Sequence, residues 1–235
     1  MTETTSAVTL PPAEPSGSHR TQGLSREIKP AARGWIHATM FPLTAIAGIV
    51  LVIAAHGTGP KIACGVFVAT ALMLFGTSAT YHLGHWREPW AGLLRRLDHS
   101  NIALIIAGTY TPLAVGLFSG LTRGLMLGLV WGGALAAILM RVLWLDAPRW
   151  SYVPIYIALG WVALGFIPQL LAAAGPSLIW LLLAGGIAYT AGAVVYGLKW
   201  PNPWPRHFGF HEIFHSCTVI GFTCHFIAVT IAVTT

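Results

Sequence analysis

The chain alternates between apolar runs of about twenty residues and short polar connections. A helical run of that length crosses a hydrocarbon core of roughly 30 Å at 1.5 Å per residue. Alternating ten-residue strands, the signature of a membrane barrel, do not occur in the sequence. The pattern therefore predicts an all-α integral membrane protein, a bundle of seven transmembrane helices at residues 36–55, 62–84, 99–118, 124–144, 152–172, 177–198 and 211–233.

The segment that precedes the first apolar run is polar and rich in Pro, Ser and Thr. Its composition predicts disorder. It also lacks the apolar stretch that a signal peptide carries near its start. We therefore expect two regions, a disordered N-terminal tail over residues 1–33 and a seven-helix membrane domain over residues 34–235.

The composition fits a chain that lies almost wholly within a membrane. Of its 235 residues, 55% are hydrophobic and only 9% are charged, whereas soluble domains carry roughly 25% charged residues. Mean hydropathy over the chain is +0.70. These values exclude a cytosolic enzyme, a disordered regulator and a nucleic-acid-binding protein, so no nucleic-acid partner is expected. Cys64, Cys217 and Cys224 lie in apolar runs without CxxC spacing, so no disulfide framework is expected.

The basic residues are distributed unevenly between the two ends of the predicted bundle. Of the 13 Lys and Arg residues, only Lys61 and Arg123 lie in connections on the side opposite the tail. Loops rich in Lys and Arg stay in the cytoplasm. This distribution predicts a cytoplasmic N-terminus and a C-terminus outside.

Small residues recur every four positions in two of the predicted helices. One series runs through Gly116, Gly120, Gly124, Gly128 and Gly132, and a shorter one comprises Ala184, Ala188 and Gly192. Such spacing lets helix backbones approach closely. We expect these faces to pack within the bundle, and a homo-oligomer formed through the Gly-rich faces is the alternative.

Several ionisable side chains are predicted to lie at one depth on the cytoplasmic side. His82 ends the second helix, Asp98 begins the third, and His211 and His215 begin the seventh. Two histidines four residues apart project about 40° from each other, which lets them bind one metal ion. With His82 they supply the three ligands that catalytic zinc commonly has. Ser78, four residues before His82, is expected to face the same cavity.

Residues 211–215 also spell HExxH, in which Glu212 would be the general base of a zinc protease. No acidic residue follows Glu212, so the downstream carboxylate ligand of many such proteases is absent. The other interpretation of Glu212 is a solvated acid in the first turn of a helix, where the helix dipole favours it.

The remaining histidines are expected away from the metal site. His225 lies about 15 Å deeper than His215 and is expected to line a cavity. His85, His99 and His207 are expected at the membrane interface.

Four motifs occur in a recognisable order: Ser78–His82 (SATYH), Leu97–Ile102 (LDHSNI), Gly108–Pro112 (GTYTP) and His211–His215 (HEIFH). This order resembles the hemolysin III family, which is grouped with the progestin and adipoQ receptors and the alkaline ceramidases. The resemblance runs from about Lys29 to the C-terminus. It implies one Zn²⁺ per chain bound by His82 of the first motif and by His211 and His215 of the last, a zinc-bound water held by Asp98, and Ser78 nearby.

The resemblance also implies a function and a location. Zinc lowers the pKa of bound water toward 7, so the implied reaction is metal-dependent hydrolysis of an amide or ester, with Asp98 as base and Ser78 facing a developing oxyanion. A cavity among seven helices favours a membrane lipid as substrate. The family and the compact connections suggest a bacterial plasma membrane. Two alternatives remain open, a pore-forming or cytolytic protein and a receptor-like protein with structural zinc.

Overall fold

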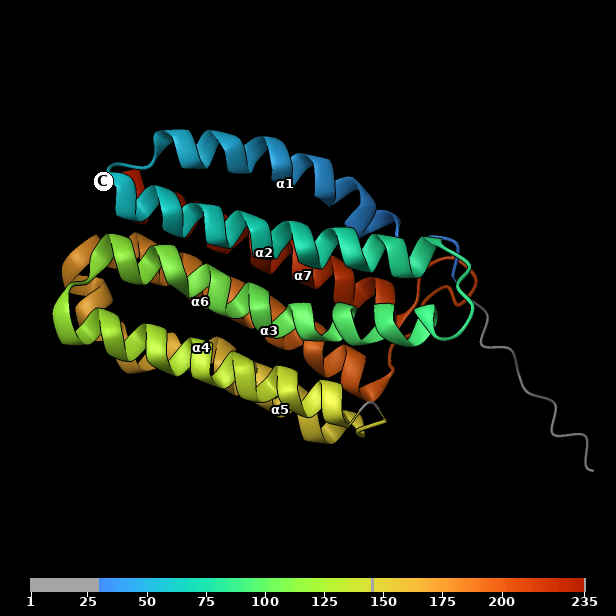
Figure 1. The fold of residues 1–235 in the computed structure, drawn as a ribbon. Helices are drawn as coiled ribbons and strands as arrows, with labels where there is room; N and C mark the ends of the chain where they lie inside the picture. Colours follow the sequence, from blue (N-terminus) through green and yellow to red (C-terminus); the bar gives the residue numbers. More distant parts are fainter. Residues whose placement is uncertain (1–29, 145, 235) are drawn as a thin grey trace, which may run out of the picture.

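The computed structural model describes residues 30–144 and 146–234, so most of the predicted tail, residues 1–29, lies outside the described residues. Over these ranges the chain is helical and contains no β-strand. Its elements are α1 (Trp35–Ala54), α2 (Thr58–Leu83), α3 (Trp90–Leu117), α4 (Gly120–Leu143), α5 (Arg149–Gly160), the 3₁₀ helix η1 (Trp161–Phe166), α6 (Ile167–Leu198) and α7 (Phe210–Thr234). Figure 1 shows the helices side by side along a common axis.

Six helical segments of the described chain are long and apolar enough to cross a membrane. Their best 18-residue windows have mean hydropathies between 1.4 and 2.1. Large apolar side chains such as Leu43, Ile53 and Leu129 point outward from these helices. Apolar side chains on the outside of a helical bundle match a lipid environment, so the chain is a multi-pass integral membrane protein.

One of the six segments, Arg149–Leu198, is 50 residues long and folds back on itself. The backbone leaves helical geometry at Gly175, where φ is 73° and ψ is −177°, immediately before Pro176. A positive φ is readily adopted by glycine. The two arms then lie against each other, since Arg149 Nη1 donates to the Tyr196 carbonyl oxygen at 2.5 Å. The predicted break between the fifth and sixth runs therefore falls at this glycine.

Helix α3 lies at the centre of the bundle, in contact with α2, α4, α5, α6 and α7. The Gly108–Pro112 motif makes several of these contacts. A Cβ at Gly108 would collide with the Thr70 side chain of α2. The Trp131 indole of α4 donates to the Thr111 hydroxyl at 3.1 Å, and the Tyr110 hydroxyl contacts the junction of α5 and η1. The motif therefore connects α3 to α2, to α4 and to the junction of α5 and η1.

Two expectations about the helices are wrong in detail. Helix α3 begins at Trp90, nine residues before the predicted start, because a mixed apolar and basic stretch continues the helix beyond its fully apolar part. Asp98 therefore lies about two turns inside α3, where neighbouring helices surround it. The expected packing of the α4 glycines within the bundle also fails, since Gly124, Gly128 and Gly132 are exposed with no neighbour near. By contrast, Gly192 of α6 packs against α7.

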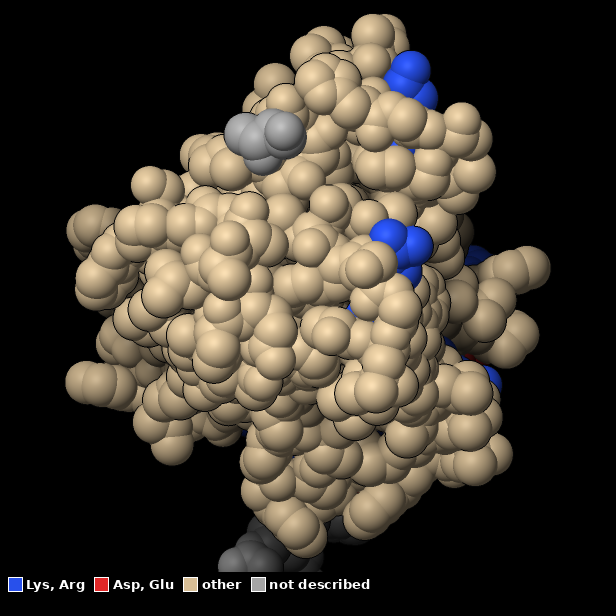
Figure 2. Space-filling view, turned by 90° about the vertical axis from the view of Figure 1, so that its left-hand side faces the viewer, with Lys and Arg blue, Asp and Glu red and all other residues tan. Residues whose placement is uncertain are grey.

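The two ends of the bundle differ in charge. Figure 2 views the end at which α1 joins α2 and α3 joins α4, and Lys and Arg are sparse on it. At the opposite end lie the α2–α3, α4–α5 and α6–α7 connections. These connections, together with the helix ends that adjoin them, contain most of the basic residues of the described chain. The histidines of α2 and α7 that could bind a metal lie at this basic end.

Candidate metal centre

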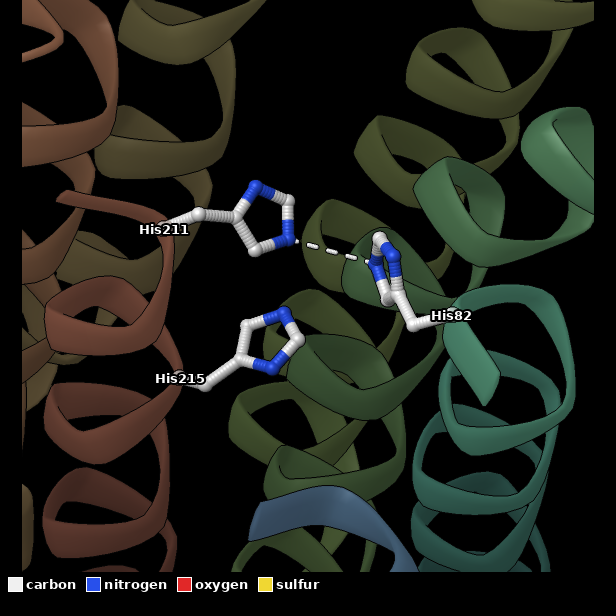
Figure 3. A group of neighbouring side chains, drawn as sticks. All are labelled: His82, His211 and His215. Atoms are coloured by element: carbon white, nitrogen blue, oxygen red, sulfur yellow. Dashed lines mark hydrogen bonds between the residues drawn. The ribbon is translucent and has the colours of Figure 1, made fainter. Parts of the chain in front are cut away.

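Three histidines from two helices converge at the basic end of the bundle. His82 lies at the C-terminal end of α2, and His211 and His215 occupy the first two turns of α7 (Figure 3). Nε2 of His211 lies 3.2 Å from Nε2 of His82. One ring nitrogen from each of the three residues lies within 4.8 Å of the others. The group could therefore hold a metal ion.

The donor set and its spacing fit a zinc ion. Neutral imidazole is a favoured zinc ligand, and tetrahedral Zn–N bonds of 2.0–2.1 Å place ligand nitrogens about 3.3 Å apart. The 3.2 Å separation between His82 and His211 is already close to this value. The other separations between ligand nitrogens in the group are no more than 4.8 Å. His82 and His215 are buried and His211 is partly buried.

The start of α7 is held in place by contacts that fix the direction of its histidines. The Glu212 carboxylate accepts a hydrogen bond from the Gly209 backbone N–H at 2.8 Å and pairs with Arg33 Nε at 2.8 Å. The Asn202 side chain accepts the Phe210 backbone N–H at 3.0 Å. These contacts satisfy N–H groups that a helix start leaves without intrahelical partners.

Glu212 is therefore not the solvated acid that the sequence suggested. It is 1% exposed, and its two oxygens are engaged by Arg33 and by the Gly209 backbone. A carboxylate held in this way is poorly placed to accept a proton from water. The geometry thus argues against the protease interpretation of the HExxH motif.

Asp98 and Ser78 lie beside the histidines. Asp98 Oδ2 is 3.7 Å from His82 Nε2, and the Ser78 side chain lies against the Asp98 carboxyl. Both residues line an internal cavity together with His211 and His215. The structure thus brings together all five residues that the sequence singled out.

Sequence reasoning missed two further histidines near this cluster. His37 of α1 is 2% exposed, and its ring stacks on His215 with centroids 3.8 Å apart and planes 5° from parallel. His99, expected at the membrane interface, instead lines the cavity and lies 2.8 Å from a guanidinium nitrogen of Arg141. The sequence spacing could not predict the contacts of His37 with His215 and of His99 with Arg141, because each contact joins two different helices.

Two cavities meet at the histidine cluster. An apolar cavity runs from His211 and His215 along α3, α5, α6 and α7 as far as His225, which lines it as expected. A second, polar cavity opens at the basic end of the bundle and includes His82 among its walls. Asp98, His99 and His211 line both cavities. The cluster therefore lies where an apolar compartment joins a polar entrance.

Comparison with known proteins gives consistent matches. The family model described as Haemolysin-III related matches residues 25–226. The hemolysin-3 homolog of Bacillus subtilis (strain 168) is 26% identical over 190 residues, which cover 81% of this chain and 86% of that protein. Hemolysin-3 of Bacillus cereus is 32% identical over 151 residues, which cover 63% of this chain and 68% of that protein. The family match includes every residue of the histidine cluster.

Proposed function

This chain belongs to the haemolysin-III-related family, and we propose that it is a zinc-dependent hydrolase of an amide or ester bond in a membrane lipid. The observation that carries the proposal is the meeting of three histidines, Asp98 and Ser78 at the inner end of a polar entrance and the start of an apolar cavity. Metal ligands, a proton acceptor and a compartment for a lipid chain thus occur at one place.

The proposed topology is seven crossings with a cytoplasmic N-terminus. The reversal at Gly175 supports counting Arg149–Leu198 as two crossings rather than one. The concentration of Arg and Lys at the tail's end of the bundle supports its cytoplasmic placement. On this topology the histidine cluster lies on the cytoplasmic side of what we propose is a bacterial plasma membrane.

In the proposed centre His82, His211 and His215 hold one Zn²⁺ per chain. Bound zinc would act as a Lewis acid and lower the pKa of water toward neutrality. Asp98 is positioned beside His82 to accept a proton at its carboxylate and later return it to the leaving group. Ser78, which lines the same cavity, would donate a hydrogen bond to the carbonyl oxygen as that oxygen becomes negative.

The walls of the inner cavity support a lipid as substrate. Its lining is dominated by Ile, Leu, Val and aromatic side chains from α3, α5, α6 and α7. An acyl chain placed there would contact mainly apolar side chains. The bond to be cleaved would then lie beside the histidines, where the two cavities meet.

The test is cleavage of long-chain lipid amides and esters by detergent-purified protein, comparing wild type with Asp98→Asn. We expect wild type to release fatty acid and Asp98→Asn to lose about 100-fold or more in rate, the usual contribution of a general base, while retaining its metal. Asp146→Asn is the matched control, because Asp146 lines the same entrance but its side chain is 89% exposed. Equal rates for Asp98→Asn and wild type would contradict the proposal.

Two other functions are separated by the same protein preparations. Both relatives are named hemolysins, which motivates a dye-release assay on liposomes that contain the purified chain. Dye release that is unaffected by Asp98→Asn would favour a pore-forming protein over a hydrolase. Metal bound at the cluster with no cleavage of any lipid would favour a receptor-like protein in which zinc joins α2 to α7.

A further inference from the structure

The polar cavity at the basic end of the bundle, here called the entrance, contains a buried guanidinium group with few hydrogen-bond partners. Arg141, near the C-terminal end of α4, is 2% exposed. One of its terminal nitrogens lies 2.8 Å from His99 Nδ1, and its guanidinium carbon lies 4.4 Å above the centre of the Tyr152 ring. Its Nε and its other terminal nitrogen have no hydrogen-bond partner among the described residues.

The His99 contact does not neutralise this charge. Arginine has five N–H donors and no acceptor, so His99 Nδ1 must accept the hydrogen bond and the ring is neutral in that tautomer. The ion pairs within the described part of the chain do not include Arg141. Buried charges are normally paired, because removal from water is otherwise strongly unfavourable. Arg141 therefore presents an uncompensated charge and free donors to the entrance.

The other charges around the entrance do not supply the missing anion. Arg33 is already paired with Glu212, and Arg149 lies 4.1 Å over the Tyr196 ring. Asp146 is highly exposed and 3.8 Å from Arg95, a geometry in which ion pairs contribute little. The other aspartate of the entrance, Asp98, lies 3.7 Å from His82 Nε2 and forms no ion pair with Arg141. The entrance is lined by four arginines against two aspartates, and its formal charge stays positive when Glu212, the partner of Arg33, is counted with them.

The apolar cavity begins directly beside this positive entrance. Asp98, His99 and His211 line both compartments, and the apolar one continues from His211 to His225, fourteen residues further along α7 and thus about 21 Å deeper. A molecule that filled both would carry a negative group at one end and a long apolar chain at the other.

We propose that the entrance is a binding site for an oxyanion, phosphate or carboxylate, that Arg141 holds through its planar fork of N–H donors. The oxyanion belongs to a lipid whose acyl chain occupies the apolar cavity. The guanidinium fork suits both groups because it can donate two parallel hydrogen bonds. The site deepens the proposed function, on which its role as a substrate site rests, by naming an anionic lipid as the substrate class.

The proposed site is tested by measuring ligand affinity rather than the rate of lipid cleavage. Chelator-treated protein in an uncharged detergent is titrated with lysophosphatidate, with the chain-matched monoacylglycerol, which has no charge, and with inorganic phosphate. We expect wild type to bind lysophosphatidate at least tenfold more tightly than either of the other two. Equal affinity for the uncharged lipid would overturn the oxyanion site, and equal affinity for inorganic phosphate would overturn the assignment to a lipid.

Substitutions of Arg141 test whether the lipid binds at this residue. Arg141→Gln should lose at least tenfold in affinity for lysophosphatidate, while Arg141→Lys, which retains charge but not the fork, should lose less. Arg123→Gln is the matched control, since Arg123 is a partly buried arginine at the opposite end, where it bonds the Phe118 backbone carbonyl. Equal binding by Arg141→Gln and wild type would overturn the site. If Arg141→Gln does not fold, the wild-type preference among the three ligands still decides.

The outcome for this site is independent of catalysis. The titration uses protein without metal, so binding that depends on Arg141 can be observed even if no lipid is cleaved. Binding without cleavage by the metal-loaded protein would contradict only the hydrolase. Cleavage of uncharged lipids at the same rate by wild type and Arg141→Gln would contradict only the anionic substrate class.

Discussion

Arg33, which is partly buried, and Glu212, which is buried, form an ion pair with an N–O distance of 2.8 Å, although 179 positions separate them in the chain. The pair joins the segment that leads into α1 to the first turn of α7. The backbone N–H groups of Ala31 and Ala32, just before Arg33, also donate to the carbonyls of Arg206 and His207, just before α7. The first and last helices are therefore locked together beside the histidine cluster.

Replacing either partner of this pair should strongly destabilise the protein. Glu212→Ala leaves Arg33 without its anion, and Arg33→Ala leaves a carboxylate that is 1% exposed. Removing one member of a buried pair costs about 3–5 kcal/mol because the other charge stays buried. Unfolding of purified protein by SDS in mixed micelles measures the loss. Asp146→Ala, which breaks an exposed pair, should change stability by less than about 1 kcal/mol.

The double variant Arg33→Ala/Glu212→Ala separates pairing from other roles. If the ion pair accounts for the destabilisation, the double variant should lose less than the sum of the two single variants, because no charge is left alone. Additive losses would show that each residue acts through different contacts.

The metal centre predicts the metal content of the purified chain. Wild type, prepared without chelators, should contain about one zinc per chain by elemental analysis, as three histidines in one group could hold a single ion. The double variant His211→Ala/His215→Ala should contain none, since one remaining imidazole does not hold zinc. His225→Ala is the control, because His225 is a partly buried histidine of the same helix that bonds the Leu182 carbonyl instead. Metal-free wild type would remove the basis for the hydrolase.

His37 is expected to position His215 rather than to bind the metal itself. Its ring stacks on His215 at 3.8 Å, and it is not among the residues whose nitrogens form the metal-binding group. His37→Ala removes this support, and residues that orient metal ligands typically contribute 10- to 100-fold in affinity. We expect zinc affinity, measured by competition with a chelating dye, to fall about tenfold in His37→Ala and less in His37→Phe, which retains a stacked ring. Complete loss of zinc in His37→Phe would instead identify His37 as a ligand.

Much of the architecture can be predicted from the pattern of apolar and polar residues along the chain. Apolar runs of membrane-spanning length locate each helix, and Gly175 followed by Pro176 marks the reversal because this pair interrupts helical geometry. The spacing of His211 and His215 predicts that they lie on neighbouring turns of one helix face. Their meeting with His82 follows from helix ends that lie at the same side of a membrane.

The features that could not be predicted from the sequence depend on which side of each helix faces its neighbours. The α4 glycines fit either a buried or an outward face by spacing alone, and the structure turns Gly124 and Gly128 outward. The environment of Glu212 depends on Arg33, a residue at the other end of the chain. The sequence alone does not indicate the burial of Arg141, because a basic residue near the end of a membrane helix is usually one of the charges that set the topology.

The hydroxyl of Tyr110 should stabilise the irregular part of the long folded-back segment. It donates to the Gly160 carbonyl at 2.6 Å and accepts the Ala163 backbone N–H at 2.9 Å, where the helix changes from α5 to η1. Tyr110→Phe leaves both partly buried backbone groups without this partner, which should lower the free energy of unfolding in an SDS titration by about 1–3 kcal/mol. Thr223→Val is the control, because its exposed hydroxyl bonds only within its own helix. A Tyr110→Phe protein as stable as wild type would show that these backbone groups find other partners.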